Sequence, residues 1–90
     1  DRALAAGLLG EVCADEQLLD VATELATRLA NGPTFAFAQT KKLMREGAQR
    51  SLPEQLQAEL AAGLLCGRSE DGNEALRASI EKRPASFIGR

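Results

Sequence analysis

Asp15 to Pro33 reads DEQLLDVATELATRLANGP, and this stretch decides the fold of the chain. Leucine and alanine recur in it every three or four residues, which is the period of a helix with one broad apolar face. Asp15 can cap this helix, because a carboxylate accepts the free backbone N–H groups of a first turn. Asn31-Gly32-Pro33 ends it, since glycine adopts positive φ and proline cannot continue a helix. The stretch therefore predicts an amphipathic helix.

Two more helices are predicted directly after this stretch. Pro33 can occupy the first position of a helix that continues to about residue 49. The large apolar residues within residues 34–38 alternate, which would also suit a strand, but the Lys-Lys-Leu-Met-Arg-Glu continuation favours a helix. Ser51-Leu52-Pro53-Glu54 has the capping-box pattern, in which serine reaches forward and glutamate reaches back. It predicts a helix that runs to Gly67.

The two ends of the chain are predicted to hold shorter elements. Residues 2–6 are expected to form the end of a helix, and residues 8–13 an extended segment or a short strand. Asp71 and Glu74 repeat the capping pattern more weakly before a final helix. We thus expect a single all-α domain over all 90 residues, with about four helices in a small bundle and one short extended segment near the N-terminus.

The composition supports helix and excludes several functional classes. Aromatic residues make up only 3% of the chain, which favours helix over strand. The net charge is −2 and there is no basic run, which argues against a nucleic-acid partner, and no apolar run approaches the roughly 20 residues that span a bilayer.

Histidine, the usual general base and metal ligand, is absent. Cys13 and Cys66 have no neighbouring ligand pattern, so we expect no metal site and two thiols of a cytoplasmic protein, with a disulfide as the alternative.

The C-terminal stretch, which reads EALRASIEKRPASFIGR from Glu74 to Arg90, carries the chain's likeness to a known family. Other features occur upstream in a fixed order: Ala5-Ala6-Gly7-Leu8-Leu9, Val12, Asp15 to Leu18, Leu25-Ala26, Pro33, Ala38, Lys41, Leu56, Glu59, Ser69 and Asp71. The ordered set resembles the C-terminal helical region of the enoyl-CoA hydratase/isomerase (crotonase) family. Residues 33–69 are most similar to its phenylacetate-degradation isomerase branch. Ala75 and Ser79 depart from the family pattern, which has Gly and Phe there.

The resemblance implies a longer parent protein of fatty-acid or phenylacetate metabolism, in which catalysis and the helical region belong to different parts of the subunit. In this family a preceding β/α core supplies the oxyanion hole and the catalytic carboxylates, so we expect no catalytic residue in these 90 residues. The chain starts as if inside a helix, as a fragment would. The parent is expected to be an enoyl-CoA hydratase or isomerase that acts on a coenzyme A thioester, with no cofactor bound by the fragment. It is also expected to form a trimer-based homo-oligomer, to which the helical region contributes contacts.

Lys82 and Phe87 are the candidate binding residues that the resemblance implies. In the family, the lysine of Glu81-Lys82-Arg83 lies near the CoA phosphates or adenine, and an ammonium is a suitable phosphate partner. The alternative is that Lys82 and Arg83 only complement the negative end of the last helix. Phe87 is either a wall of the CoA pocket or an anchor that holds the tail on the bundle.

A free-standing helical interaction module is the alternative function. A small acidic helical chain could also be an acyl carrier protein, which needs Asp-Ser-Leu at a helix start. Arg50-Ser51-Leu52 lacks that aspartate and Pro53 follows directly, so Ser51 is better explained as a cap.

Overall fold

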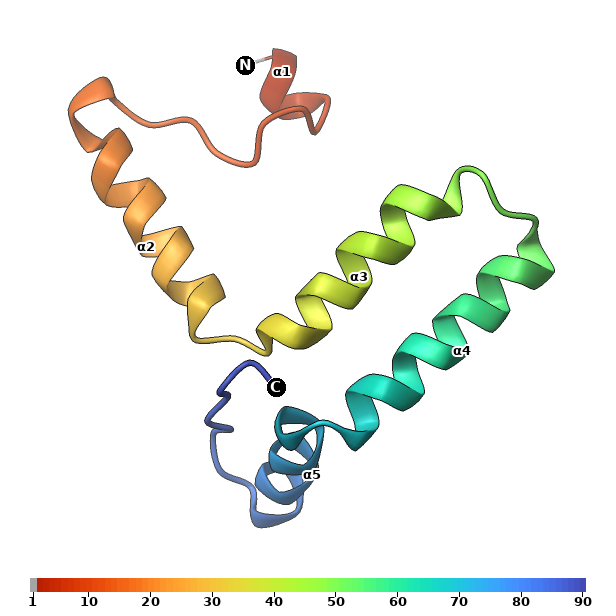
Figure 1. Cartoon of the computed structure of the whole chain (residues 1–90). Helices are drawn as coiled ribbons and strands as arrows, with labels where there is room; N and C mark the ends of the chain where they lie inside the picture. The colour runs from red at the N-terminus through yellow and green to blue at the C-terminus, as the bar shows by residue number, and fades with distance from the viewer. Residues whose placement is uncertain (1) are drawn as a thin grey trace.

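The computed structural model describes residues 2–90 and is all-helical over that range, which confirms the predicted fold class. Its elements, labelled in Figure 1, are α1 (Arg2–Ala5), the 3₁₀ turn η1 (Asp15–Gln17), α2 (Leu18–Ala30), α3 (Thr34–Gly47), α4 (Leu52–Arg68) and α5 (Glu70–Glu81). Four of them are long, as expected. Residues 34–38 are helical, so the strand alternative is wrong there.

The N-terminal part differs from the expectation in two details. Residues 8–13 contain no strand, so of the two alternatives for this stretch the short strand is wrong; they form a loop after Gly7, whose φ of 71° turns the chain after α1. Asp15 does not cap α2, because it starts η1 and makes no side-chain cap hydrogen bond. Since Ala14 occupies the position before that turn, the Asp15 carboxylate lies within the first turn. There it can complement only the positive end of the helix.

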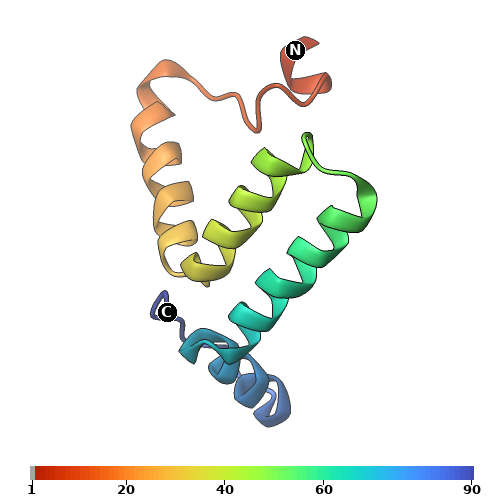
Figure 2. The ribbon, with the colours of Figure 1, turned by 45° about the vertical axis from the view of Figure 1, so that its right-hand side comes forward.

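Helices α3 and α4 form an antiparallel pair and lie side by side in both ribbon views (Figures 1 and 2). The predicted capping box forms at the start of α4: the Glu54 carboxylate accepts the backbone N–H of Ser51 at 2.8 Å and its hydroxyl at 2.6 Å. These two bonds lower the pKa of Glu54. Arg50, in the connection, pairs with Glu46 of α3 and donates to Gln55 of α4, which ties the two helices together.

A sharp corner joins α4 to α5, and Ser69 forms it. Its hydroxyl accepts the N–H of Gly72 at 2.9 Å and donates to the carbonyl of Cys66 at 2.7 Å. Ser69 is therefore the cap of α5, so the predicted caps, Asp71 and Glu74, are wrong. Gly72 lies against the last turn of α4, where an added Cβ would meet the Cys66 carbonyl oxygen at 2.1 Å, so only glycine fits.

The helices leave most of their apolar side chains exposed. Among residues 2–90, the buried apolar residues are Ala62 and Ala78. The accessible surface is 7463 Å², against about 5,100 Å² for a compact monomer of this mass. The radius of gyration is 16.7 Å, against about 12 Å for a compact 90-residue domain. Thus α4 packs on α3 and α5, but the helices do not close around one shared core.

The C-terminal tail runs back along α5, and two carboxylates of the helix accept its backbone N–H groups, while a third, Glu70, pairs with the Arg90 side chain at 3.1 Å. Asp71, only 3% exposed, accepts the backbone N–H groups of Ile88 at 2.7 Å and Gly89 at 2.9 Å. The N–H of Asp71 in turn donates to the Arg90 carbonyl at 2.8 Å. Glu74 accepts the N–H of Ser86 at 3.0 Å. The roles of Asp71 and Glu74 are therefore to hold the tail, not to start the helix.

Glu74 should make the stability of this region depend on pH. Hydrogen bonds from the Arg83 guanidinium, and next from the Ser86 N–H, lower the pKa of Glu74 from 4.5 to about 2. A lowered folded-state pKa means that the stabilisation is complete above pH 4.5 and is lost as the pH falls toward 2. We predict that Glu74→Gln lowers the thermal midpoint between pH 5 and 7, and that this difference shrinks steadily between pH 4.5 and 2.

The control is the same substitution made in an Arg83→Gln background. Without the guanidinium the Glu74 carboxylate loses its principal partner, so Glu74→Gln should then change the midpoint little at any pH. If the thermal midpoint of the wild type stayed above that of Glu74→Gln by a constant amount down to pH 2, the stabilising role of the ionised Glu74 carboxylate would be contradicted.

Candidate functional site

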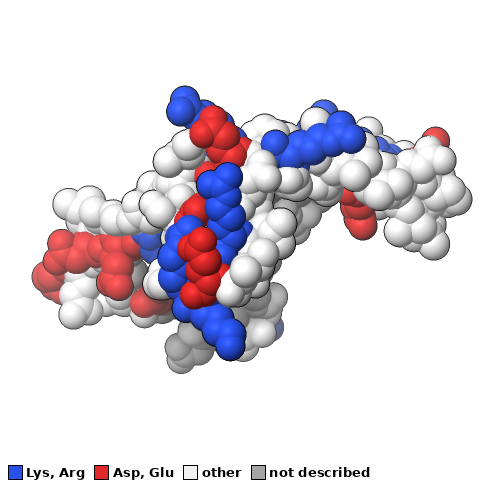
Figure 3. Space-filling view, turned by 90° about the horizontal axis from the view of Figure 1, so that it is seen from below, with Lys and Arg blue, Asp and Glu red and all other residues white. Residues whose placement is uncertain are grey.

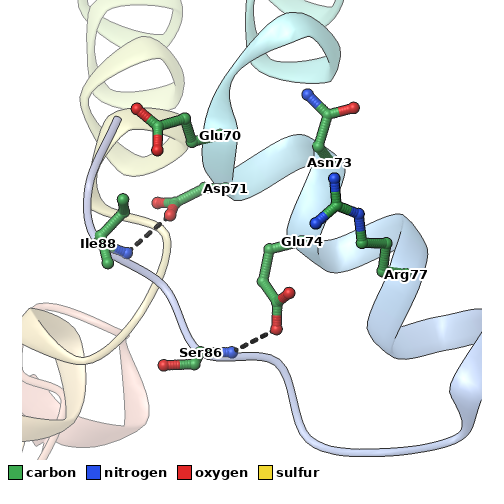
Figure 4. Close-up of a pocket in the computed structure, with 7 residues that line it drawn as sticks. All are labelled: Glu70, Asp71, Asn73, Glu74, Arg77, Ser86 and Ile88. Carbon is green, nitrogen blue, oxygen red and sulfur yellow. Dashed lines mark hydrogen bonds between the residues drawn. The ribbon is translucent and has the colours of Figure 1, made fainter.

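The returning tail and α5 enclose an open cleft of about 410 Å³. Figure 4 shows its lining residues, which come from α5 and from the tail: Glu70, Asp71, Asn73, Glu74, Arg77, Ser86 and Ile88. Two of its carboxylates, Asp71 and Glu74, already accept backbone N–H groups of the tail. A general base needs an available lone pair within reach of a substrate proton, so neither carboxylate is arranged for proton transfer.

Lys82, the first candidate binding residue, lies directly after α5 in the left-handed conformation, with φ 53° and ψ 41°. Its N–H donates to the Ser79 carbonyl at 3.4 Å, and the N–H of Arg83 donates to the Ala78 carbonyl at 3.0 Å. These bonds form the Schellman arrangement, in which the left-handed residue is usually glycine. A residue with a Cβ costs roughly 1–2 kcal/mol in that conformation. Within residues 2–90, Lys82 is the one non-glycine residue with positive φ.

Arg83, the next residue, uses all its guanidinium nitrogens inside the chain. Nη1 and Nη2 donate to the two oxygens of Glu74 at 2.5 and 3.0 Å, and Nε donates to Glu81 at 2.6 Å. Nη1 also donates to the Pro84 carbonyl at 3.1 Å. These carboxylates, Glu74 foremost, raise the pKa of Arg83. Four of its five N–H groups are thus bonded within the chain, so Arg83 holds the turn together and keeps one Nη2 N–H free of these contacts.

The ammonium of Lys82 is placed differently from the guanidinium of Arg83. Lys82 is exposed, and over the described part of the chain its side chain takes part in no ion pair or hydrogen bond. The two adjacent cations thus have separate roles: Arg83 is a structural ion-pair partner, and Lys82 presents a charge to its surroundings.

Phe87, the second candidate, is half-buried and lines a small apolar cavity of about 180 Å³. The cavity is formed where the start of α3, the end of α4 and α5 meet, with Pro33, Ala36, Cys66 and Ala75 among its walls. This position supports the interpretation of Phe87 as an anchor of the tail. The structure does not bring Lys82 and Phe87 into one cavity, since neither described cavity that borders the tail includes Lys82.

The remaining side chains form no second reactive cluster in the described chain. Cys13 and Cys66 are free thiols, and no group of three or more metal-ligating side chains occurs within residues 2–90. None of the described helices combines the length and apolar character needed to cross a membrane. On the face seen from below in Figure 3, acidic and basic side chains are interleaved.

Asp71 is the cleft residue whose role the sequence did not reveal. Its carboxylate accepts from Ile88 and Gly89, which follow it by 17 and 18 residues, and it can reach them only because the chain reverses after α5. The Asp71 pattern looked like a weak helix cap. The one local signal was Gly89, whose φ of 83° lets the tail end bend toward Asp71.

The sequence is similar to several curated enzymes, each over a limited part of their length. It is 36% identical over 84 residues to 1,2-epoxyphenylacetyl-CoA isomerase of Escherichia coli, which covers 93% of this chain and 32% of that protein. It is 31% identical over 90 residues to crotonyl-CoA hydratase of Syntrophomonas wolfei, which covers 100% of this chain and 35% of that protein. The chain therefore spans about a third of the length of the curated relatives it matches.

The fold agrees with this similarity. A crystal structure from Mycobacterium abscessus, described as an enoyl-CoA hydratase/isomerase, superposes with a TM-score of 0.94 at 38% identity, over 99% of this chain and 34% of that one. The family model for enoyl-CoA hydratase/isomerase matches residues 1–90. The motifs occur in the family's order, the fold is shared and the family model matches all 90 residues of this chain, so the chain belongs to the enoyl-CoA hydratase/isomerase family.

Proposed function

We propose that this chain is the C-terminal helical region of an enoyl-CoA hydratase or isomerase that acts on acyl-CoA thioesters. Its task is to contribute to assembly and to close part of the CoA site, while the rest of the subunit performs the catalysis. The buried carboxylate within residues 2–90, Asp71, is engaged by the tail, which supports a role without proton transfer. The 36% identity to an epoxyphenylacetyl-CoA isomerase is consistent with the phenylacetate branch.

The observation that carries the CoA-binding part of the proposal is the conformation of Lys82. A lysine is kept at a left-handed position where glycine would be less strained. Residues held in such conformations cluster at ligand-binding and catalytic sites, because the strain persists only where the surroundings enforce it. The Lys82 ammonium is exposed and is therefore available to a CoA phosphate. Phe87 then serves to hold the tail that follows this turn.

The observation that carries the assembly part is the exposed apolar surface. Large apolar side chains on every long helix are more than 40% exposed, among them Leu18, Leu19, Met44, Leu52, Leu60, Leu76 and Ile80. Apolar surface of this extent marks an interface in a stable protein. We assign it to contacts with the preceding part of the same subunit and with other copies in a homo-oligomer. The two free thiols are compatible with the cytoplasm.

We predict that the isolated 90-residue chain self-associates. Its helices cannot bury their apolar faces against each other, so copies should cover them mutually, with exchange of helices at the hinges Asn31-Gly32-Pro33 and Gly67–Gly72. Light scattering combined with size exclusion measures this directly. A matched variant, in which Leu60→Gln and Leu64→Gln make the exposed face of α4 polar, should shift the mass downward. A clean monomer mass for the unmodified chain at high concentration would contradict the assembly role.

We predict that Lys82→Ala in the complete enzyme raises KM for the CoA substrate and leaves kcat nearly unchanged. The contact lies away from the reacting carbon, so it contributes similarly to the ground and transition states. A charge-assisted contact that is partly solvated suggests a loss of roughly 1–2 kcal/mol, or about 5- to 30-fold in KM. The control is Lys41→Ala, which removes an exposed lysine of α3 and should leave KM unchanged. An unchanged KM in Lys82→Ala would leave Lys82 as a helix-end charge only.

A further inference from the structure

After α5, the carboxylates of Glu74 and Glu81 bind Arg83, while the adjacent Lys82 side chain makes no ion pair within the described chain. Both oxygens of Glu74 accept from Arg83, at 2.5 and 3.0 Å, across nine residues of sequence. We infer that Glu74 is a positioning residue for CoA binding, because by holding Arg83 it fixes the left-handed backbone of Lys82 and so directs the Lys82 ammonium. This inference rests on the proposed role of Lys82 as a phosphate partner.

The Glu74–Arg83 pair can form only when the chain reverses. If α5 continued through Lys82 as a regular helix, nine residues would separate the two Cα atoms by about 14 Å along the axis. The guanidinium could then not make the observed two-bond contact with the carboxylate. The pair therefore stabilises the reversed chain and not the continued helix. It opposes the preference of a residue with a Cβ for the right-handed conformation at position 82.

Apart from the Schellman bonds of the backbone, the other contacts of the tail hold this turn less directly than Glu74 does. Asp71 binds Ile88 and Gly89, six and seven residues beyond Lys82, so the intervening chain could move while those bonds persist. Glu81 also accepts from Arg83, but the two residues are only two apart, and that contact does not depend on the returning tail. Glu74 bonds from within α5 to the side chain of Arg83, the residue that immediately follows Lys82, and it also accepts from Ser86. It acts beside the backbone bond from the Arg83 N–H to the Ala78 carbonyl.

Double-mutant analysis of the complete enzyme tests the inference, with coenzyme A as the ligand in calorimetry and crotonyl-CoA as the substrate in kinetics. Four forms are compared: wild type, Glu74→Ala, Lys82→Gly and the double variant. Glycine at position 82 removes the ammonium and relieves the left-handed strain, so any loss of binding cannot come from a destabilised turn. Glu59→Ala, on the exposed side of α4, is the matched control, and it should leave CoA affinity unchanged.

We expect Lys82→Gly to weaken CoA binding by about 5- to 30-fold and Glu74→Ala to weaken it by roughly threefold or more, each in KM and not in kcat. The double variant should bind CoA as Lys82→Gly does, since Glu74 acts only through Lys82. The charge-swapped variant Glu74→Arg with Arg83→Glu restores the pair and should recover affinity over Glu74→Ala. This recovery also separates positioning from a loss of folding.

The outcomes distinguish the inference from the proposed function. If Lys82→Gly weakens CoA binding but Glu74→Ala does not, the positioning role is wrong and the role of Lys82 stands. If the two effects multiply in the double variant, Glu74 affects binding by another route and the inference is overturned. If Lys82→Gly has no effect, the CoA-binding proposal for Lys82 fails, and the positioning role fails with it.

Discussion

A left-handed turn at Lys82 is the constraint on which the C-terminal part of this structure depends. The turn sends residues 84–90 back along α5, and without the reversal neither Asp71 nor Glu74 could reach the tail. The turn is unfavourable for a lysine by itself, because its Cβ crowds the following carbonyl. It persists because a buried carboxylate, a bidentate ion pair and the Schellman bonds all favour the same path.

The same turn separates two neighbouring positive charges. Arg83 points back to Glu74 and Glu81, where its planar guanidinium matches two carboxylates. Lys82, one residue earlier, remains exposed. A guanidinium is well suited to a fixed, bidentate structural pair, and an ammonium is a compact charge on a flexible stem. The flexible ammonium of Lys82 is thus followed by the fixed guanidinium of Arg83, and this arrangement is the basis of the positioning role inferred for Glu74.

The open arrangement of the helices has a physical origin in the sequence. Each long helix carries an apolar stripe, but alanine and leucine dominate and large aromatic side chains are nearly absent. The long helices that pack on each other are neighbours in the sequence: α3 packs on α4 across a short connection, and α4 packs on α5 across the corner at Ser69. The chain matches about a third of its relatives' length, and its described helices leave large apolar side chains that they do not cover themselves.

The sequence by itself determined the helices, their breaks and the family. Apolar periodicity predicted α2, the capping box at Ser51 predicted α4, and Asn31-Gly32-Pro33 marked the end of α2, because these signals act within one or two turns. Only the tertiary structure decided the roles of Asp71, Glu74 and Arg83. The contacts that Asp71 and Glu74 make beyond the turn span 9 to 18 residues, across a reversal in which a lysine takes the left-handed conformation where glycine would be expected. Local propensity carries no information about such contacts, since they exist only after the chain has turned back on itself.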